Sequence, residues 1–144
     1  MRTLSMIAIL GCMFALPLSS CSSKKSLNIT SAEWQLTGVR SSGESQEFLT
    51  PSNNGRPVTL TVTAEGMTHG HSGCNNFSGK VEVKKQSLTF GNLVSTRMFC
   101  IDGMEIEDAL LNVLRITDNY EVKKDSTLLL KQGPEIVASF VPLR

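Results

Sequence analysis

The sequence contains no concentration of positive charge. Its 14 lysines and arginines are nearly balanced by 13 acidic residues, which gives the 144-residue chain a net charge of +1. The basic clusters are no more than pairs, at Lys24–Lys25, Lys84–Lys85 and Lys123–Lys124. A protein that binds duplex nucleic acid needs a concentrated basic face that displaces counterions from the phosphates. We therefore expect no nucleic-acid partner.

The sequence also lacks a hydrophobic run of the roughly 20 residues that a membrane-spanning helix requires. A shorter apolar stretch covers residues 6–16 and follows the positively charged Arg2. This arrangement is typical of an export signal rather than of a spanning helix. Once residues 1–20 are removed, the remaining chain is long enough for one domain with a core and too short for two.

The export signal ends in Leu18-Ser19-Ser20-Cys21, which resembles the lipobox of bacterial lipoproteins. In that signal the cysteine thiol receives a diacylglycerol group and becomes the new N-terminus. The resemblance implies a lipoprotein signal peptide over residues 1–20, lipidation of Cys21 and attachment to a membrane of the bacterial cell envelope. The alternative is an ordinary secretory signal that leaves Cys21 as a free thiol, which would be a reactive liability in an oxidising compartment.

The residue after Cys21 bears on which membrane holds the protein. An aspartate there resembles an inner-membrane retention signal of some Gram-negative bacteria, and this chain has Ser22 instead. We therefore expect the outer membrane, with the protein facing the periplasm. Residues 21–32 are mostly small and polar and predict a flexible lipidated tether, so the folded domain is expected over residues 33–144.

From residue 33 onward, hydrophobic residues mostly alternate with polar ones, as they do in half-buried β-strands. The alternation is strictest over residues 58–63. Residues 40–57 are rich in Gly, Ser, Asn and Pro and predict a long loop. The remaining strands are expected around residues 34–39, 67–71, 77–83, 88–93, 120–122, 128–130 and 136–140.

The period of the pattern changes over residues 104–116, which predict one α-helix. Asp102 is expected to cap this helix, and Glu105, Glu107 and Asp108 are expected to interact with the positive end of its dipole. About eight strands and one inserted helix predict a mainly β (α+β) fold. We expect a small antiparallel β-barrel, closed or cracked, because curling removes unpaired sheet edges. The apolar residues at helical spacing are Ile106, Ala109, Leu110, Val113 and Leu114.

Two stretches of the domain carry a recognisable pattern, SGCNNFSG at residues 72–79 and STRMFC at residues 95–100. They resemble the G-C-N-x-F/Y-x-G and T-x-M-x-C elements of the META domain in HslJ-like bacterial lipoproteins, where an acidic helix start follows. The resemblance extends over residues 33–142 and implies a small barrel-like sheet packed with a helix. The motif residues here are Gly73, Asn75, Phe77, Gly79, Thr96 and Met98.

The resemblance implies a non-enzymatic, membrane-anchored envelope lipoprotein that serves envelope or heat-stress tolerance through an envelope protein partner. A similar cracked barrel occurs in secretin pilot lipoproteins, so the alternative is a pilot-like chaperone or a carrier of lipid or peptide in a gap of the barrel. A carrier needs an open apolar cavity of some hundreds of cubic ångströms. A barrel filled by Leu, Val and Phe side chains favours the first reading. We expect a monomer.

Cys74 and Cys100 are the cysteines that remain once residues 1–20 are removed and Cys21 is lipidated. An even pair in an exported domain most simply forms a disulfide, which would stabilise the fold by roughly 3 kcal/mol in the chain-entropy model. Two buried free thiols are the alternative reading.

His69 and His71 are the histidines of the chain. On a strand they would share one face, and with Cys74 they could bind a metal ion. Because Cys74 is expected in the disulfide and no further histidine exists, we expect no metal site. The sequence also contains no nucleophile elbow that would support a Ser-His-Asp triad. Glu105, Glu107 and Asp108 are better explained by the helix dipole than by a paired-carboxylate hydrolase, so we expect neither an enzyme nor a cofactor.

Overall fold

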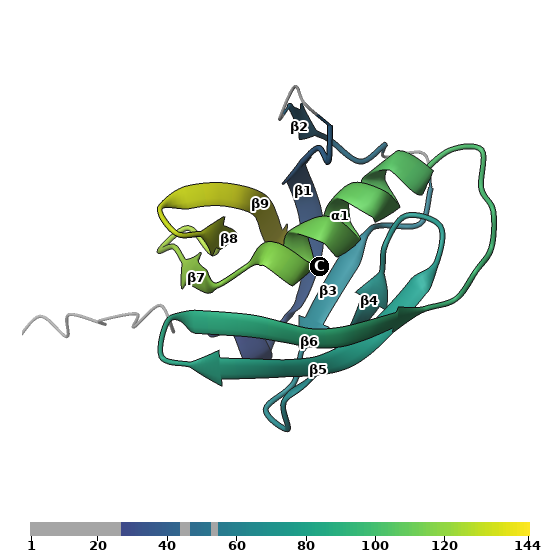
Figure 1. Cartoon of the computed structure of the whole chain (residues 1–144). Helices are drawn as coiled ribbons and strands as arrows, with labels where there is room; N and C mark the ends of the chain where they lie inside the picture. The colour runs from purple at the N-terminus through teal and green to yellow at the C-terminus, as the bar shows by residue number, and fades with distance from the viewer. Residues whose placement is uncertain (1–26, 44–46, 53–54) are drawn as a thin grey trace, which may run out of the picture.

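The computed structural model describes residues 27–43, 47–52 and 55–144 (Figure 1). Residues 1–20 and Cys21 therefore lie outside the described residues. The fold consists of a short 3-10 turn η1, one α-helix α1 and nine antiparallel strands. Their bounds are η1 Ile29–Ser31, β1 Glu33–Arg40, β2 Phe48–Leu49, β3 Thr59–Val62, β4 Met67–His71, β5 Asn76–Lys84, β6 Ser87–Ser95, α1 Met104–Ile116, β7 Asn119–Val122, β8 Leu128–Gln132 and β9 Glu135–Pro142.

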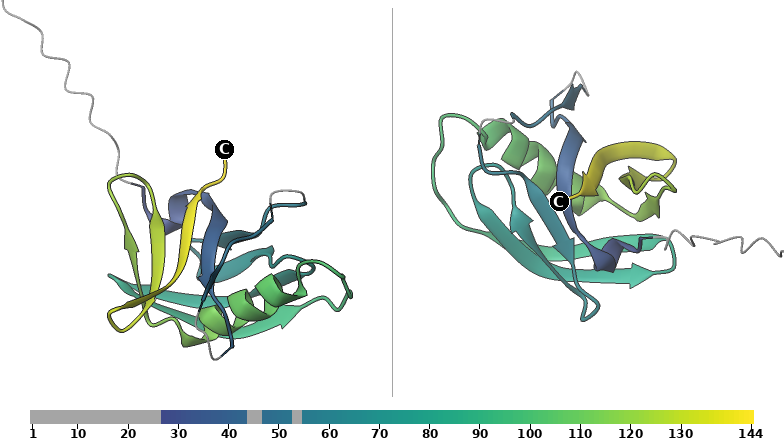
Figure 2. Two further views of the ribbon diagram at one scale, coloured as in Figure 1. Left: turned by 90° about the horizontal axis from the view of Figure 1, so that it is seen from above. Right: turned by 180° about the vertical axis from the view of Figure 1, so that it is seen from behind.

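The strands form one sheet in the order β2-β1-β3-β4-β5-β6-β7-β8-β9, and β1 also pairs with β9, so the sheet closes into a ring (Figure 2). The predicted mainly β architecture with one inserted helix is confirmed. The helix has the predicted bounds. The strand count is nine rather than about eight because Phe48 and Leu49 pair with β1 inside the region predicted as a loop.

The ring is least continuous between β6 and β7. A single residue pair, Ser87 and Asn119, defines their register. Backbone hydrogen bonds extend the junction by one residue on either side, from Leu88 N to Asp118 O (3.1 Å) and from Tyr120 N to Gln86 O (2.9 Å). The helix connects these two strands in the chain and packs against β1, β6 and β9 (Figures 1 and 2). It therefore adds packed surface where the sheet is weakest.

Large apolar side chains from the strands and the helix fill the interior of the ring. They pack around Trp34, the one tryptophan of the chain, which is fully buried. Trp34 Nε1 donates a hydrogen bond of 2.7 Å to the carbonyl oxygen of Ile29. The largest side chains with less than 2 % exposure are Trp34, Phe140, Ile29, Leu60, Leu88, Leu110, Leu114, Leu128 and Leu130.

The domain begins earlier than the sequence predicted. Residues 27–32 were expected to belong to the flexible tether, but Ile29 is fully buried and Leu27 and Ala32 pack against the core. The physical reason is the apolar character of these side chains together with the hydrogen bond between Ile29 and Trp34. Five residues, 22–26, therefore separate Cys21 from the first residue that packs against the core. Fully extended, the chain from Cys21 to Leu27 would span at most about 20 Å.

No helix among residues 27–43, 47–52 and 55–144 has the length and apolarity that a bilayer crossing demands.

Candidate functional site

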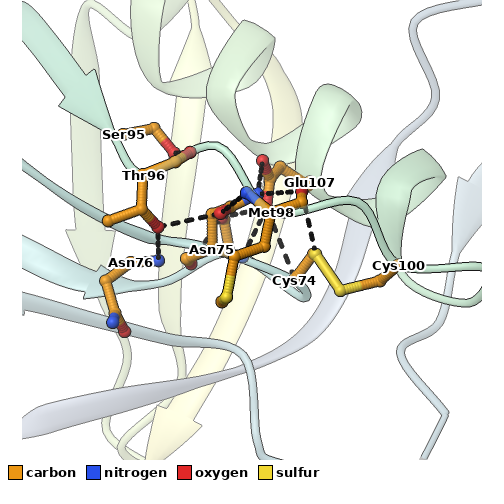
Figure 3. Close-up of a disulfide and its surroundings, with 9 residues drawn as sticks. Cys74, Asn75, Asn76, Ser95, Thr96, Met98, Cys100 and Glu107 are labelled. Carbon is orange, nitrogen blue, oxygen red and sulfur yellow. Dashed lines mark hydrogen bonds between the residues drawn. A yellow bond between two sulfur atoms is a disulfide. The ribbon is translucent and has the colours of Figure 1, made fainter.

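The two sequence motifs meet at the first turns of α1 (Figure 3). The first motif covers the turn between β4 and β5 and the start of β5, and the second begins at the last residue of β6. The side chain that joins them is the carboxylate of Glu107, which is buried with 5 % of its surface exposed. We call this group the carboxylate cluster, and it consists of Ser72, Cys74, Asn75, Thr96, Met98 and Glu107.

Both oxygens of the Glu107 carboxylate accept hydrogen bonds from the first motif. Oε2 accepts from the backbone N–H of Asn75 (2.7 Å) and of Cys74 (3.3 Å), while Oε1 accepts from Asn75 Nδ2 (2.9 Å). The Ser72 hydroxyl lies 2.7 Å from Oε2 and 2.8 Å from the carbonyl oxygen of Asn75, and its single proton serves one of them. A buried carboxylate with this many donors is well compensated for its loss of water.

Asn75 links the carboxylate to the second motif. Its Nδ2 also donates to the carbonyl oxygen of Met98 (3.0 Å), and its Oδ1 accepts from Met98 N (2.7 Å) and from Thr96 Oγ1 (2.8 Å). The amide thereby uses both donors and both acceptor positions, the full capacity of an asparagine side chain. Asn75 therefore fixes the segment after β6 relative to the helix.

The disulfide joins the same two segments covalently. The Sγ atoms of Cys74 and Cys100 lie 1.98 Å apart, and the Cα atoms lie 5.8 Å apart. This is the pairing that the sequence predicted. Cys74 is buried and its backbone N–H belongs to the carboxylate cluster, so the covalent and hydrogen-bonded links act on one turn.

Two opposing influences set the pKa of Glu107. Burial is the largest and raises it, but hydrogen bonds from Ser72, the side chain and backbone of Asn75, and the Cys74 N–H together outweigh burial. The pKa of Glu107 therefore lies below its usual value, and the carboxylate is ionised at neutral pH. Its negative charge strengthens the hydrogen bonds from the turn between β4 and β5, which we call the motif turn.

Asp102 does not cap the helix, contrary to the prediction. Gly103 occupies the N-cap position in a left-handed conformation (φ 104°), without a side-chain cap. Gly73 (φ 124°) faces it closely, since a Cβ atom at Gly73 would lie 2.8 Å from Gly103 O, and one at Gly103 would lie 2.9 Å from Gly73 O. Two glycines therefore let the motif turn approach the start of the helix.

We expect Gly73→Ala to lower the free energy of unfolding by about 2 kcal/mol, because an L-residue is strained at this φ and its methyl group meets backbone. Chemical denaturation measures the loss. Gly133→Ala is the matched control, since Gly133 also has a positive φ (56°) but, apart from its two chain neighbours, no atom of the described residues would lie within 4 Å of the added methyl group. The control should lose only about 1 kcal/mol, and equal losses would refute the close-approach argument.

The remaining motif residues have separable roles. Phe77 is buried in the core. Gly79 lets β6 approach β5, because a Cβ atom there would lie 2.7 Å from Asn92 O. Thr96 Oγ1 accepts from Asn76 N (3.2 Å) and donates to Asn75. Met98 contributes its backbone to the cluster, while its side chain is 57 % exposed.

The two histidines lie in different environments. His69 is exposed, whereas His71 is 6 % exposed and its Nδ1 atom has no hydrogen-bond partner among the described residues. Burial, followed by the positive charge of Arg56, lowers the pKa of His71. Cys74, the proposed third ligand, is bonded to Cys100. Within the described part of the chain, no group of three or more His, Cys, Asp or Glu side chains is placed to hold a metal ion.

The chain is similar to known proteins in both sequence and fold. A family model described as the META domain matches residues 27–142. An NMR structure of a protein from Burkholderia xenovorans is 26 % identical, with a TM-score of 0.63, and the match covers 91 % of this chain and 99 % of that one. No curated protein matches the chain significantly.

A crystal structure of a DUF4847 family protein from Bacteroides vulgatus is 13 % identical, with a TM-score of 0.56. That match covers 78 % of this chain and 93 % of the other. At this identity the likeness shows a shared fold alone.

Proposed function

The chain belongs to the META domain family, and we propose that it is an HslJ-like lipoprotein of the bacterial cell envelope. It would be held by lipid on Cys21, most favourably at the outer membrane facing the periplasm. In this proposal the domain is not an enzyme and acts through contacts with envelope proteins, in tolerance of envelope or heat stress.

The observation that carries the proposal is the sequence Leu18-Ser19-Ser20-Cys21 behind a short apolar stretch. The pair Cys74–Cys100 supports it independently, because disulfides persist in oxidising compartments outside the cytosol. The folded domain starts at about residue 27, which leaves a short chain between it and the proposed lipid. The domain would therefore work close to the membrane surface.

The geometry of the carboxylate cluster supports a non-enzymatic role. Glu107 and Asn75 have their hydrogen-bonding groups occupied by neighbours within the fold. Such groups hold a structure and are not free to exchange protons with a substrate. The packed interior of the ring likewise favours a contact-making lipoprotein over a carrier, which would need an open apolar cavity.

Cys21→Ser is expected to abolish incorporation of labelled palmitate and to release the protein from the membrane fraction. The wild-type protein should incorporate the label and accumulate as a precursor when the lipoprotein signal peptidase is inhibited. The measurement is metabolic labelling followed by fractionation of the envelope.

Cys12→Ser is the matched control, because Cys12 lies within the proposed signal peptide and its loss should change neither readout. Wild-type protein without label, or Cys21→Ser protein with undiminished label, would exclude lipidation at this cysteine.

A further inference from the structure

Two of the lysine pairs of the sequence flank the point where the described chain begins. Leu27 lines a depression together with Gln86 and residues 120–122. Lys84–Lys85 stand directly before Gln86, at the turn between β5 and β6, and Lys123–Lys124 directly follow residue 122, in the turn between β7 and β8. The left view of Figure 2 shows the β7–β8 turn beside the start of the described chain. We call the two turns the lysine turns.

Acidic neighbours offset part of the charge of the lysine turns, whose four lysines are all exposed. Glu82 forms an ion pair with Lys84, and Asp125 lies in the β7–β8 turn itself. Glu121 lies next to that turn and forms an ion pair with Lys131. Among the residues that the structure describes, the lysines of these turns with no carboxylate at ion-pair distance are Lys85, Lys123 and Lys124.

The charges of the domain divide into two regions of opposite sign. Every lysine after Cys21 belongs to residues 22–26, to β5 and its turn, or to the β7–β8 hairpin, and they are Lys24, Lys25, Lys80, Lys84, Lys85, Lys123, Lys124 and Lys131. The acidic residues in or beside these segments are fewer: Glu33, Glu65, Glu82, Glu121 and Asp125.

The other described residues have the opposite balance. Apart from Arg144, whose charge the terminal carboxylate cancels, their basic side chains are Arg40, Arg56, Arg97 and Arg115. Their acidic side chains are more numerous, and they are Glu47, Asp102, Glu105, Glu107, Asp108, Asp118 and Glu135. The region next to residues 22–26 is therefore positive, and the rest of the domain, which includes the start of α1, is negative.

The short reach of residues 22–26 limits which end of the domain can meet a membrane. If Cys21 lies at the lipid surface, Leu27 lies at most about 20 Å from it. β6 starts beside Gln86, close to Leu27, and ends at Ser95, where the loop that exposes Phe99 begins. Its nine residues rise about 3.4 Å each, which makes the strand about 30 Å long. The domain therefore cannot stand on the membrane with the Phe99 loop downward, whereas the lysine turns are within reach (Figures 1 and 2).

We propose that the lysine turns bind the anionic headgroups of the membrane that holds the protein, an inference that rests on the lipidation proposed above. Lysine ammonium groups attract phosphate groups as compact positive charges, and this attraction acts within about 8–10 Å of an anionic bilayer. A basic patch beside a lipid chain gives a protein a second attachment to the same surface. The negative region, with the start of α1 and the Phe99 loop, then faces away from the membrane.

The test is labelling of lysine amines by a membrane-impermeant acylating reagent in the lipidated full-length protein, read by mass spectrometry of its peptides. In vesicles of phosphatidylethanolamine and phosphatidylglycerol, labelling of Lys84, Lys85, Lys123 and Lys124 should fall at least threefold relative to nonionic detergent micelles. Lys80 is the internal control, since it is exposed on β5 about 13 Å from Lys84, and it should label equally in both. Replacing phosphatidylglycerol by phosphatidylcholine should remove most of the protection.

Removing one lysine pair gives a second readout. Lys84→Gln with Lys85→Gln should raise the labelling of Lys123 and Lys124 in the anionic vesicles at least twofold, because both turns hold the same surface. Arg97→Gln with Arg115→Gln is the matched control. It removes the same charge from two exposed positions outside the lysine turns and should leave the labelling unchanged.

The outcomes separate this proposal from the lipoprotein proposal. Equal labelling of the four lysines in vesicles and micelles, by protein whose intact mass includes the acyl groups, would overturn this proposal and leave the other standing. An intact mass without acyl groups would overturn both. Protection that persists undiminished in phosphatidylcholine would also overturn this proposal, because the lysines would then be covered without anionic headgroups.

Discussion

Replacing Glu107 by glutamine is expected to lower the free energy of unfolding by about 3 kcal/mol, as when a buried charge is removed from its hydrogen bonds. Because glutamine has nearly the same shape as glutamate, the loss of stability would come from the changed hydrogen-bonding groups and not from altered packing. Its amide group would place a donor where a carboxylate oxygen now accepts from Asn75 or Cys74. Urea denaturation followed by the fluorescence of the buried Trp34 measures the loss.

The loss should depend on pH in a defined direction. Because the folded protein holds the pKa of Glu107 below its usual value, the stability from this carboxylate is fully present above the unfolded pKa of about 4.3. It is lost as the pH falls through the lower pKa of the folded state. The difference between wild type and Glu107→Gln should therefore be largest near neutral pH and shrink in acid.

Glu105→Gln serves as the control for this prediction. Glu105 lies in the same first turn of α1 but is exposed, so it contributes only the few tenths of a kcal/mol expected from the helix dipole. If Glu105→Gln and Glu107→Gln lose the same stability, Glu107 acts through the dipole and the carboxylate cluster has no special energetic role.

The sequence predicted the strands and the helix well because their patterning is local. The alternation from residue 58 and the helical spacing from residue 104 each report which side chains face the core. In β1, Val39 departs from the alternation set by Trp34 and Leu36, because a β-bulge between Leu36 and Gly38 turns Leu36 and Val39 to the same side. The pairing of β2 with β1 was missed, because two residues carry no periodicity.

The role of Glu107 was missed for a different reason. Beside Glu105 and Asp108 it looked like one of three dipole-stabilising acids, and its partners are more than 30 positions away in sequence. One signal could have found it. Glu107 stands three and seven positions before the buried Leu110 and Leu114, so it shares their face of the helix. A carboxylate on the buried face must have a partner.

Replacing both Cys74 and Cys100 by alanine is expected to lower the free energy of unfolding by about 3 kcal/mol in the chain-entropy model, because the bond closes a loop of 26 positions. Urea denaturation again measures the change. Treating wild-type protein with a reducing agent should lower its stability to near that of the double variant. The double variant is the control, and its stability should not respond to the reductant.

The disulfide and Glu107 should also be energetically coupled. Cys74 donates its backbone N–H to Glu107 and lies in the turn that the carboxylate binds, so removing the disulfide loosens the donors on which the carboxylate depends. Residues that share partners lose stability non-additively. Adding Glu107→Gln to the alanine double variant should therefore cost clearly less than the about 3 kcal/mol expected in the wild-type background. Additive losses would show that the covalent and hydrogen-bonded links stabilise the fold independently.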